Sequence, residues 1–235
     1  MPKKRQPRLY SYVLRYDDGA APNPFYGICT LVICKPRIRL GAQEGDWVVG
    51  TGSAHSPLGD KRGWLVYAMK LTQPKLTLAK YDKWAKKHCR GKLPDPANSD
   101  IDRRCGDAIY DFSGRKPKQR WSVHGQGEKK TDLSGRYALL SKQFFYFGSQ
   151  PIELPKKLKK ICHPTSGERW RPNEALKDDF VTWLESLGKP VNKVFAAPAR
   201  PPLRQKRLRG NCSDNRPCTT SCVQPKNPPR QNPRC

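Results

Sequence analysis

Apolar and polar residues alternate in a strand-like pattern through the N-terminal third of the chain. Aromatic and β-branched residues, which favour strands, are concentrated in four segments: 9–16 (LYSYVLRY), 28–38 (ICTLVICKPRI), 46–50 (DWVVG) and 64–72 (WLVYAMKLT). Gly, Pro and Asp residues separate these segments, as is typical of turns and loops. The pattern predicts short strands, with Pro36 ending the second segment and Gly45-Asp46 turning the chain into the third.

Helical periodicity occurs in two places. Residues 76–88 place apolar side chains at helical spacing, and residues 173–188 do so again, with Asn173 as a candidate N-cap and Gly188 as a stop. Between them, the apolar run 137–148 predicts a buried strand or a strand pair. Residues 90–136 are rich in Gly, Pro and charge, so they are either functional or an insertion.

This order of elements favours an α+β fold over an alternating βαβ pattern. Short strands with Gly-rich turns fit a small, partly closed β-barrel flanked by helices. We expect a disordered basic arm over residues 1–8, a single domain over 9–195, and a Pro-, Arg- and Cys-rich disordered tail over 196–235.

The chain has a formal net charge of +26 and an isoelectric point near 10.0. Residues 200–235 hold nine basic residues and one acidic residue, so the rest of the chain still carries about +18. A body with this charge favours a polyanionic partner, with nucleic acid preferred to a membrane surface.

Neither an export signal nor an apolar run long enough to span a membrane is evident in the sequence. We therefore expect a cytoplasmic protein whose nine cysteines are mostly reduced thiols. Paired metal-ligand spacings are lacking, because Cys29 and Cys34 would face opposite sides of a regular strand. Cys105 follows two Arg residues, but an inert buried thiol is its simpler interpretation. No cofactor or metal is expected, and the oligomeric state stays open.

Several longer stretches together resemble the nucleotide modification associated domain family, second type. The resemblance covers about residues 9–190 and lies in YSYVLRYDDGAAPNPFYG, CKPRIRLGAQEGDWVVGTGS, DRRCGDAIY, His124 followed by Asp132, and ALLSKQFFYFG. It implies a link to DNA-base modification. The order of Arg, Gly-Asp, apolar strand and Gly is also similar to PUA, ASCH and EVE barrels, in which a Gly-Asp turn precedes a strand beside a pocket for RNA or a modified base.

Candidate binding residues combine positive charge with aromatic rings. Base stacking needs flat π surfaces beside cationic groups, and the loop and strand segments supply both. Asp46 would orient a basic side chain such as Arg39, and Arg37 and Arg39 would share one strand face. Alternatively, these residues form ordinary turns, core and solvated strand surface. The candidate nucleotide-binding set is Arg15, Asp17, Asn23, Phe25, Tyr26, Arg39, Asp46 and Trp47.

Catalysis would need a group that titrates near neutral pH, and His124 in WSVHGQG is the best candidate. Asp132 and Asp107 are its candidate partners, with Asp17 and Asp102 as further carboxylates. The sequence fixes no distance between these residues. Three functions therefore stay open. The first is a protein that holds a base of nucleic acid or of a modified nucleotide in a barrel pocket, and the second is an enzyme that uses His124 and Asp residues as acid and base. The third is a basic nucleic-acid-associated protein without pocket chemistry.

Overall fold

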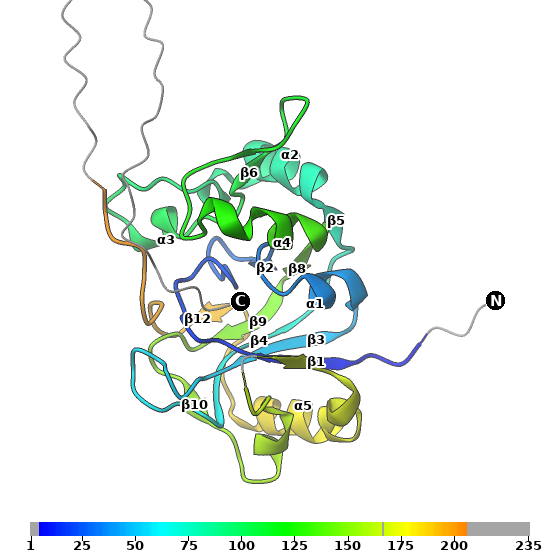
Figure 1. The fold of residues 1–235 in the computed structure, drawn as a ribbon. Helices are drawn as coiled ribbons and strands as arrows, with labels where there is room; N and C mark the ends of the chain where they lie inside the picture. The colour runs from blue at the N-terminus through cyan, green and yellow to red at the C-terminus, as the bar shows by residue number, and fades with distance from the viewer. Residues whose placement is uncertain (1–4, 166, 206–235) are drawn as a thin grey trace, which may run out of the picture.

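A mixed β-sheet forms the centre of the protein (Figure 1). The computed structural model describes residues 5–165 and 167–205. Among these residues the sheet has seven strands in the order β11-β1-β3-β4-β9-β12, with β10 beside β4. Their bounds are Leu9–Val13 (β1), Trp47–Thr51 (β3), Trp64–Lys70 (β4), Gln143–Tyr146 (β9), Ile152–Glu153 (β10), Glu168–Arg169 (β11) and Lys193–Val194 (β12).

The centre of this sheet is the β3–β4 pair, which is antiparallel. Leu71 N–H donates to Asp46 O and Gly45 N–H donates to Leu71 O, both at 2.8 Å, so the turn closes directly onto the end of β4. β1 joins β3 in parallel, and β9 joins β4 in antiparallel orientation. The segments 46–50 and 64–72, both predicted as strands, thus form neighbouring strands of one sheet.

Alternate residues of these strands point into two cores, because successive side chains of a strand face opposite sides. Leu9 and Val49 pack with Phe180 and Leu184 of α5 (Lys177–Ser186). Figure 1 shows α5 on this side of the sheet and α1, α2, α3 and α4 on the other. The sheet is therefore covered on both faces.

The opposite core contains Tyr12 and Val48 together with Ile38 of α1 (Pro36–Gly41). A second sheet with the order β2-β8-β5 contributes Leu139 to the same core. Its strands are Cys29–Leu31 (β2), Leu76–Thr77 (β5) and Tyr137–Ser141 (β8). The remaining elements on this side are α2 (Leu78–His88), η1 (Arg90–Lys92), α3 (Ile101–Arg104), β6 (Tyr110–Asp111), β7 (Lys118–Gln119), η2 (Gln126–Glu128) and α4 (Lys129–Ser134).

The α+β class is confirmed, but the expected PUA- or EVE-like barrel is not. In the part of the chain that the structure describes, the main sheet stays open, with β11 at one edge and β12 at the other. The reason lies in the apolar run 137–148, which divides at Lys142. β8 pairs with β2 and β5, whereas β9 pairs with β4, so the two strands belong to different sheets.

Both predicted helices exist, with altered starts. The first begins at Leu78, and Thr77 caps it by accepting a hydrogen bond from Lys80 N–H. The second begins at Lys177 after a 3₁₀ segment, η4 (Arg171–Leu176). Asn173 is therefore not its cap. Its buried amide instead donates to Leu9 O and Ser11 Oγ, at 3.0 and 2.8 Å, and ties η4 to β1. The basic segment before it forms η3 (Leu158–Ile161).

The ordered body extends further in both directions than the sequence predicts. Arg5 bonds to Asp46 from within the expected basic arm. At the other end, Arg200 N–H donates to Asp17 O and Arg104 Nε donates to Pro202 O, both at 2.8 Å. Arg200 and Pro202 thus contact the domain from within the predicted tail, and the rest of that tail, 206–235, lies outside the described residues. No helix within the described ranges combines the length and apolar character that crossing a membrane requires.

Candidate active site

The chain reverses direction shortly after β2, and Cys34 lies in that reversal. Cys34 and Lys35 have φ values of 58° and 40°, in the left-handed region where residues other than Gly are strained. Pro36 then starts α1, because its fixed φ suits the first turn of a helix. Cys34 is 9% exposed, so it lies at the margin of the core.

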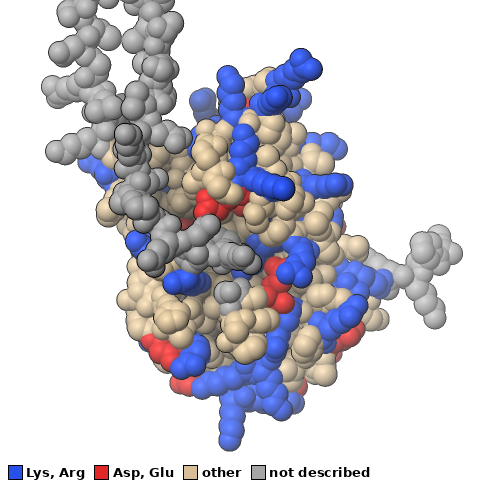
Figure 2. Space-filling view, viewed as in Figure 1, with Lys and Arg blue, Asp and Glu red and all other residues tan. Residues whose placement is uncertain are grey.

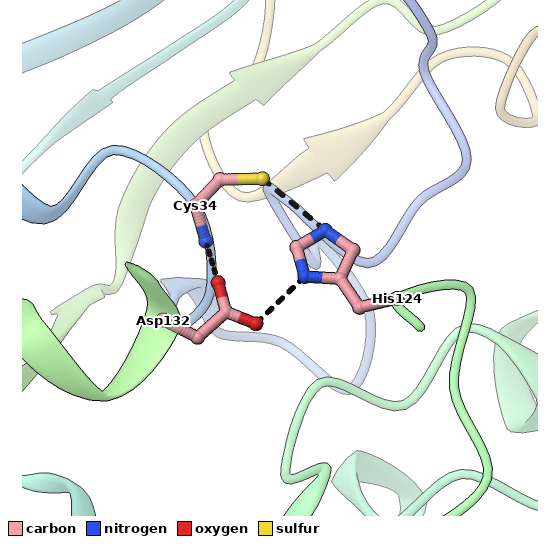
Figure 3. Close-up of side chains that lie close together, drawn as sticks. All are labelled: Cys34, His124 and Asp132. Atoms are coloured by element: carbon pink, nitrogen blue, oxygen red, sulfur yellow. Dashed lines mark hydrogen bonds and ion pairs between the residues drawn. The ribbon is translucent and has the colours of Figure 1, made fainter. Parts of the chain in front are cut away.

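His124 and Asp132 meet Cys34 at this turn (Figure 3). Cys34 Sγ lies 3.3 Å from His124 Nε2, and His124 Nδ1 lies 2.7 Å from Asp132 Oδ2. His124 comes from the loop before η2, and Asp132 comes from α4. The three side chains form a continuous chain of contacts from thiol to imidazole to carboxylate, and we call them the Cys34 cluster.

Asp132 holds this cluster together through three contacts. Besides His124, its carboxylate accepts a hydrogen bond from Cys34 N–H at 2.8 Å and one from the Tyr110 hydroxyl at 3.0 Å. Burial, reinforced by the neighbouring Asp132 carboxylate, raises the pKa of Tyr110, so the phenol stays protonated and acts as a donor. Asp132 therefore fixes both the backbone of the nucleophile candidate and the ring of the base candidate.

Arg39 is buried beneath the turn and binds three backbone carbonyls. Its guanidinium donates to Cys34 O at 2.7 Å, to Tyr137 O at 3.0 Å and to Asp132 O at 2.5 Å. Burial lowers the pKa of Arg39 to about 10, which still leaves it charged at neutral pH. Gly135 makes room for it, since a Cβ there would lie 2.3 Å from Arg39 Cζ. Both backbone polar groups of Cys34 are thus held by side chains, which maintains its strained φ.

This geometry suits proton transfer from a thiol. An ionised carboxylate can only accept hydrogen bonds, so Asp132 selects the imidazole tautomer that carries its proton on Nδ1. Nε2 is then left to accept the proton of Cys34. A thiolate paired with an imidazolium is the activated form of cysteine nucleophiles.

The other cysteines of the described chain lack this setting. Burial raises the pKa of the Cys29 thiol to about 12 and also raises the pKa values of Cys89, Cys105 and Cys162. Cys105 lies against Asp18 O, at 3.2 Å. Among these described thiols, Cys34 is the one that faces an imidazole nitrogen.

The Cys34 cluster could also hold a cation, since its ligand atoms lie within 4.8 Å of one another. A catalytic Zn²⁺ takes three such ligands and leaves one position open. However, Cys34 lies beside Nε2 of the His124 ring and Asp132 lies beside Nδ1. A single ion can bind only one of these two ring nitrogens. The arrangement therefore fits a proton relay better than a metal centre.

Asp107, the third predicted catalytic residue, belongs to a separate buried cluster. It accepts hydrogen bonds from Thr30 Oγ1 at 2.5 Å and from the Tyr81 hydroxyl at 2.6 Å. Lys92, also fully buried, donates to Asn23 Oδ1 at 2.6 Å, to Ile28 O at 2.8 Å and to Thr30 Oγ1 at 3.1 Å. We call this the Lys92 cluster; it joins β2, α2 and η1 and includes the predicted binding residue Asn23.

The predicted pairing of Asp46 with Arg39 is wrong. Asp46 is fully buried and binds the Arg5 guanidinium through both oxygens, at 2.9 and 2.5 Å. It also accepts hydrogen bonds from the N–H groups of Arg8 and Gln43, both at 2.8 Å. Asp46 therefore docks the N-terminal segment onto the turn before β3.

The predicted strand face with Arg37 and Arg39 is wrong as well. Both residues lie on α1, because Pro36 starts a helix where the sequence pattern predicts a strand end. Arg37 points to solvent and pairs with Glu168 at 3.2 Å, whereas Arg39 is buried. Helical spacing separates two side chains that strand spacing would have placed together.

Other predicted binding residues lie within the core. Trp47 packs edge-on against Phe180, and Asp17 accepts a hydrogen bond from the Tyr146 hydroxyl at 2.6 Å. Both Trp47 and Asp17 are buried. Burial raises the pKa of Asp17 to about 6. Their polar and aromatic groups face the protein interior, and their role in binding remains a prediction.

Three predicted residues are more accessible. Arg15 is exposed and lies 5.4 Å from the centre of the neighbouring Tyr16 ring. Tyr26 is 39% exposed, and Phe25 lines a shallow groove of about 530 Å³ together with Asp102 and residues 194–198. None of these contacts is with a residue of the Cys34 cluster. Nucleotide binding by these three residues remains a prediction.

Sequence reasoning did not select Cys34, Tyr110 or Lys92. One signal for Cys34 was present: a cysteine directly before Lys-Pro, where Pro starts a helix and the preceding residues must turn. The distances to His124 and Asp132, 90 and 98 residues away in the chain, depend on the fold.

Comparison with known proteins gives one positive result. No curated protein and no solved structure matches the chain. Residues 6–204 match the family described as nucleotide modification associated domain 2, which covers the sheet, both buried clusters and the segment after β12. The chain therefore belongs to the nucleotide modification associated domain 2 family.

Proposed function

We propose that the protein is a cysteine-dependent enzyme that acts on a nucleotide or nucleic-acid substrate. The observation that carries this proposal is the contact chain from Cys34 Sγ through His124 to Asp132. The family association with nucleotide modification supports the substrate class. The net charge of +26 supports an anionic partner.

In the proposed reaction Cys34 is the nucleophile. Its proton moves to His124 Nε2, and the sulfur electron pair forms a bond to an electrophilic carbonyl carbon of the substrate while the carbonyl π electrons move to oxygen. Collapse of this adduct expels the leaving group, which takes the proton back from the imidazolium. Water, deprotonated by His124, then cleaves the thioester. Acyl transfer is the class that such a Cys–His–Asp arrangement serves on unrelated folds.

A protein that only holds a base in a barrel pocket has weaker support. Within the described ranges the sheet is open, and Arg39 and Asn23, two of the candidate nucleotide-binding residues, are buried and bonded to their own chain. Base binding alone would also not explain the contact between the His124 imidazole and Cys34. We therefore prefer the enzyme.

The test is the pH dependence of Cys34 alkylation by iodoacetamide, followed by peptide mass spectrometry. Access of the reagent to the thiol changes the labelling rate by the same factor at every pH. The shape of the plot of rate against pH therefore reports the thiolate fraction. For a thiol with an ordinary pKa of about 8.5, the thiolate fraction falls roughly a hundredfold between pH 8.5 and pH 6. The thiolate fraction of Cys34 should fall less than about thirtyfold, because imidazolium-paired thiols have pKa values of about 3.5–7.5.

Cys89 is the matched internal control, because it is more exposed than Cys34 and its pKa is raised by burial. His124→Ala should give Cys34 the steep profile of Cys89. A Cys34 profile in the wild-type protein as steep as that of Cys89, or one unchanged by His124→Ala, would overturn the proposed function.

A further inference from the structure

The β6–β7 hairpin, residues 110–119, projects from the body beside α2 (Figure 1). Tyr110 pairs with Gln119 and Asp111 with Lys118, so residues 112–117 form the tip. Residues 113–116 of the tip are exposed. In Figure 2 the same end of the molecule carries a group of Lys and Arg side chains.

The tip carries positive charge, and the acids at its base are already paired. Arg115, Lys116 and Lys118 are exposed and take part in none of the ion pairs found in the described part of the chain. Asp82 and Asp111 instead bind Lys86 and Arg120, at 2.7–3.2 Å. Lys80, Lys83 and Lys87 are exposed on α2, the helix beside the hairpin, and add further positive charge to this end of the molecule.

The base of the hairpin contacts the Cys34 cluster from both strands. On β6, the Tyr110 hydroxyl donates to Asp132. On β7, the Gln119 amide donates to His124 O at 2.9 Å. Lys129 of α4 donates to Pro117 O at 3.0 Å and fixes the tip to the helix that carries Asp132. A ligand on the hairpin is therefore held in a fixed relation to the thiol.

We propose that this hairpin binds the phosphate backbone of a nucleic-acid duplex, and that the substrate of the Cys34 cluster is therefore a polymer. The proposal rests on the proposed function for its second part. A two-stranded β-ribbon fits the major groove of a duplex, and unpaired Arg and Lys side chains are the usual phosphate contacts.

The reach of the hairpin argues against a free nucleotide. Four residues separate Tyr110 from Gly114, which at about 3.3 Å per residue places the tip roughly 13 Å from the residue that contacts Asp132. A substrate that contacts both Cys34 and the tip must bridge this distance. A duplex has a phosphate about every 3.4 Å along each strand, so roughly four consecutive nucleotides of one strand span that distance.

The test uses the full chain and a fluorescent DNA duplex of mixed sequence, with affinity measured at a series of NaCl concentrations. The hairpin variant is Arg115→Ala/Lys116→Ala/Lys118→Ala. The matched control, Lys156→Ala/Lys160→Ala/Lys193→Ala, removes the same charge from exposed positions elsewhere. Each duplex phosphate contact contributes about −0.9 to the log–log salt slope. The hairpin variant should therefore lose about 2–3 from the magnitude of the slope, and the control less than about 1.

A second readout places the duplex relative to the site. Saturating duplex should slow iodoacetamide labelling of Cys34 in the wild-type protein and the control variant, and should do so less in the hairpin variant at equal DNA concentration. Equal slopes for the two triple variants, or no duplex binding by the wild-type protein at low salt, would overturn the hairpin proposal. The labelling profile of Cys34 without DNA tests the proposed function separately, so the two proposals can fail independently.

Discussion

Two clusters of buried polar side chains meet at β2 and the turn that follows it. In the Lys92 cluster, ammonium, carboxylate, hydroxyl and amide groups bind one another within the core. In the Cys34 cluster, a thiol faces an imidazole at the margin of the core. Burial and charge are common to both. The difference is that Cys34 and His124 can exchange a proton next to solvent, whereas the Lys92 cluster has only structural bonds to make.

The same long segment, residues 90–136, supplies residues to both clusters. Lys92 and Asp107 join one, and Tyr110, His124 and Asp132 join the other. The segment contains little regular structure, yet its polar side chains bind partners in β2, in the turn after β2 and in α2. We infer that residues 90–136 are an integral part of the domain and not an insertion.

The largest expected effect breaks the Lys92 cluster. Lys92→Met should lower the free energy of unfolding by about 3–5 kcal/mol, because it leaves the Asp107 carboxylate buried without its cation and removes one hydrogen bond from each of four oxygen atoms. Urea denaturation followed by tryptophan fluorescence measures the change.

The control for this prediction is Cys34→Ser, which should change the free energy of unfolding by less than about 1 kcal/mol. Adding Asp107→Asn to Lys92→Met should recover part of the loss, since it removes the unpaired charge. A Lys92→Met variant as stable as the wild-type protein would show that the Lys92 cluster does not hold the fold together.

The sequence pattern predicts those parts of the fold that depend on neighbouring residues. DWVVG and WLVYAM follow strand alternation, and Thr77 to His88 follows helical spacing, so β3, β4 and α2 could be predicted. The open sheet could not, because the separation of β8 from β9 depends on which distant strands each one meets.

The candidate site shows the same limit. His124 and Asp132 could be selected as titratable groups in a polar segment, but nothing in the chain fixes their distance. Cys34 was missed because strand alternation was extended past Leu31, where β2 ends. The left-handed backbone at Cys34 and Lys35 breaks that alternation and turns the thiol toward His124.

A third buried carboxylate, Asp17, sharpens the comparison, because a hydroxyl and an N–H group bind it in place of an ammonium group. The Tyr146 hydroxyl donates at 2.6 Å, and Ala199 N–H donates at 3.4 Å. Burial raises the pKa of Asp17 from 3.8 to about 6. The folded protein thus binds this proton more tightly than the unfolded chain does.

The sign of the pH dependence follows from that shift. The contribution of Asp17 to stability should be complete below about pH 4, should fall as the pH rises towards 6, and should be flat above it, with a total change of about 3 kcal/mol. Asp17→Asn should remove this term, so the difference in unfolding free energy between the two proteins should change between pH 4 and pH 7. Parallel stability curves over that range would show that Asp17 titrates normally.

The smallest expected effect comes from matched tyrosines, one in each cluster. The Tyr81 hydroxyl donates to Asp107 and the Tyr110 hydroxyl donates to Asp132. Tyr81→Phe and Tyr110→Phe should each lower the free energy of unfolding by about 1.5–3 kcal/mol, the range for a hydrogen bond to a charged group. In stability these two variants should therefore look alike.

Alkylation of Cys34 should separate them. With one donor fewer, the Asp132 carboxylate becomes more basic and holds the His124 imidazolium more tightly, which favours the thiolate. In Tyr110→Phe the pH midpoint of Cys34 labelling should therefore move down by a fraction of a pH unit, whereas in Tyr81→Phe it should stay where it is in the wild-type protein. Equal midpoints in the two variants would mean that the hydrogen bond from Tyr110 to Asp132 does not influence the thiolate of Cys34.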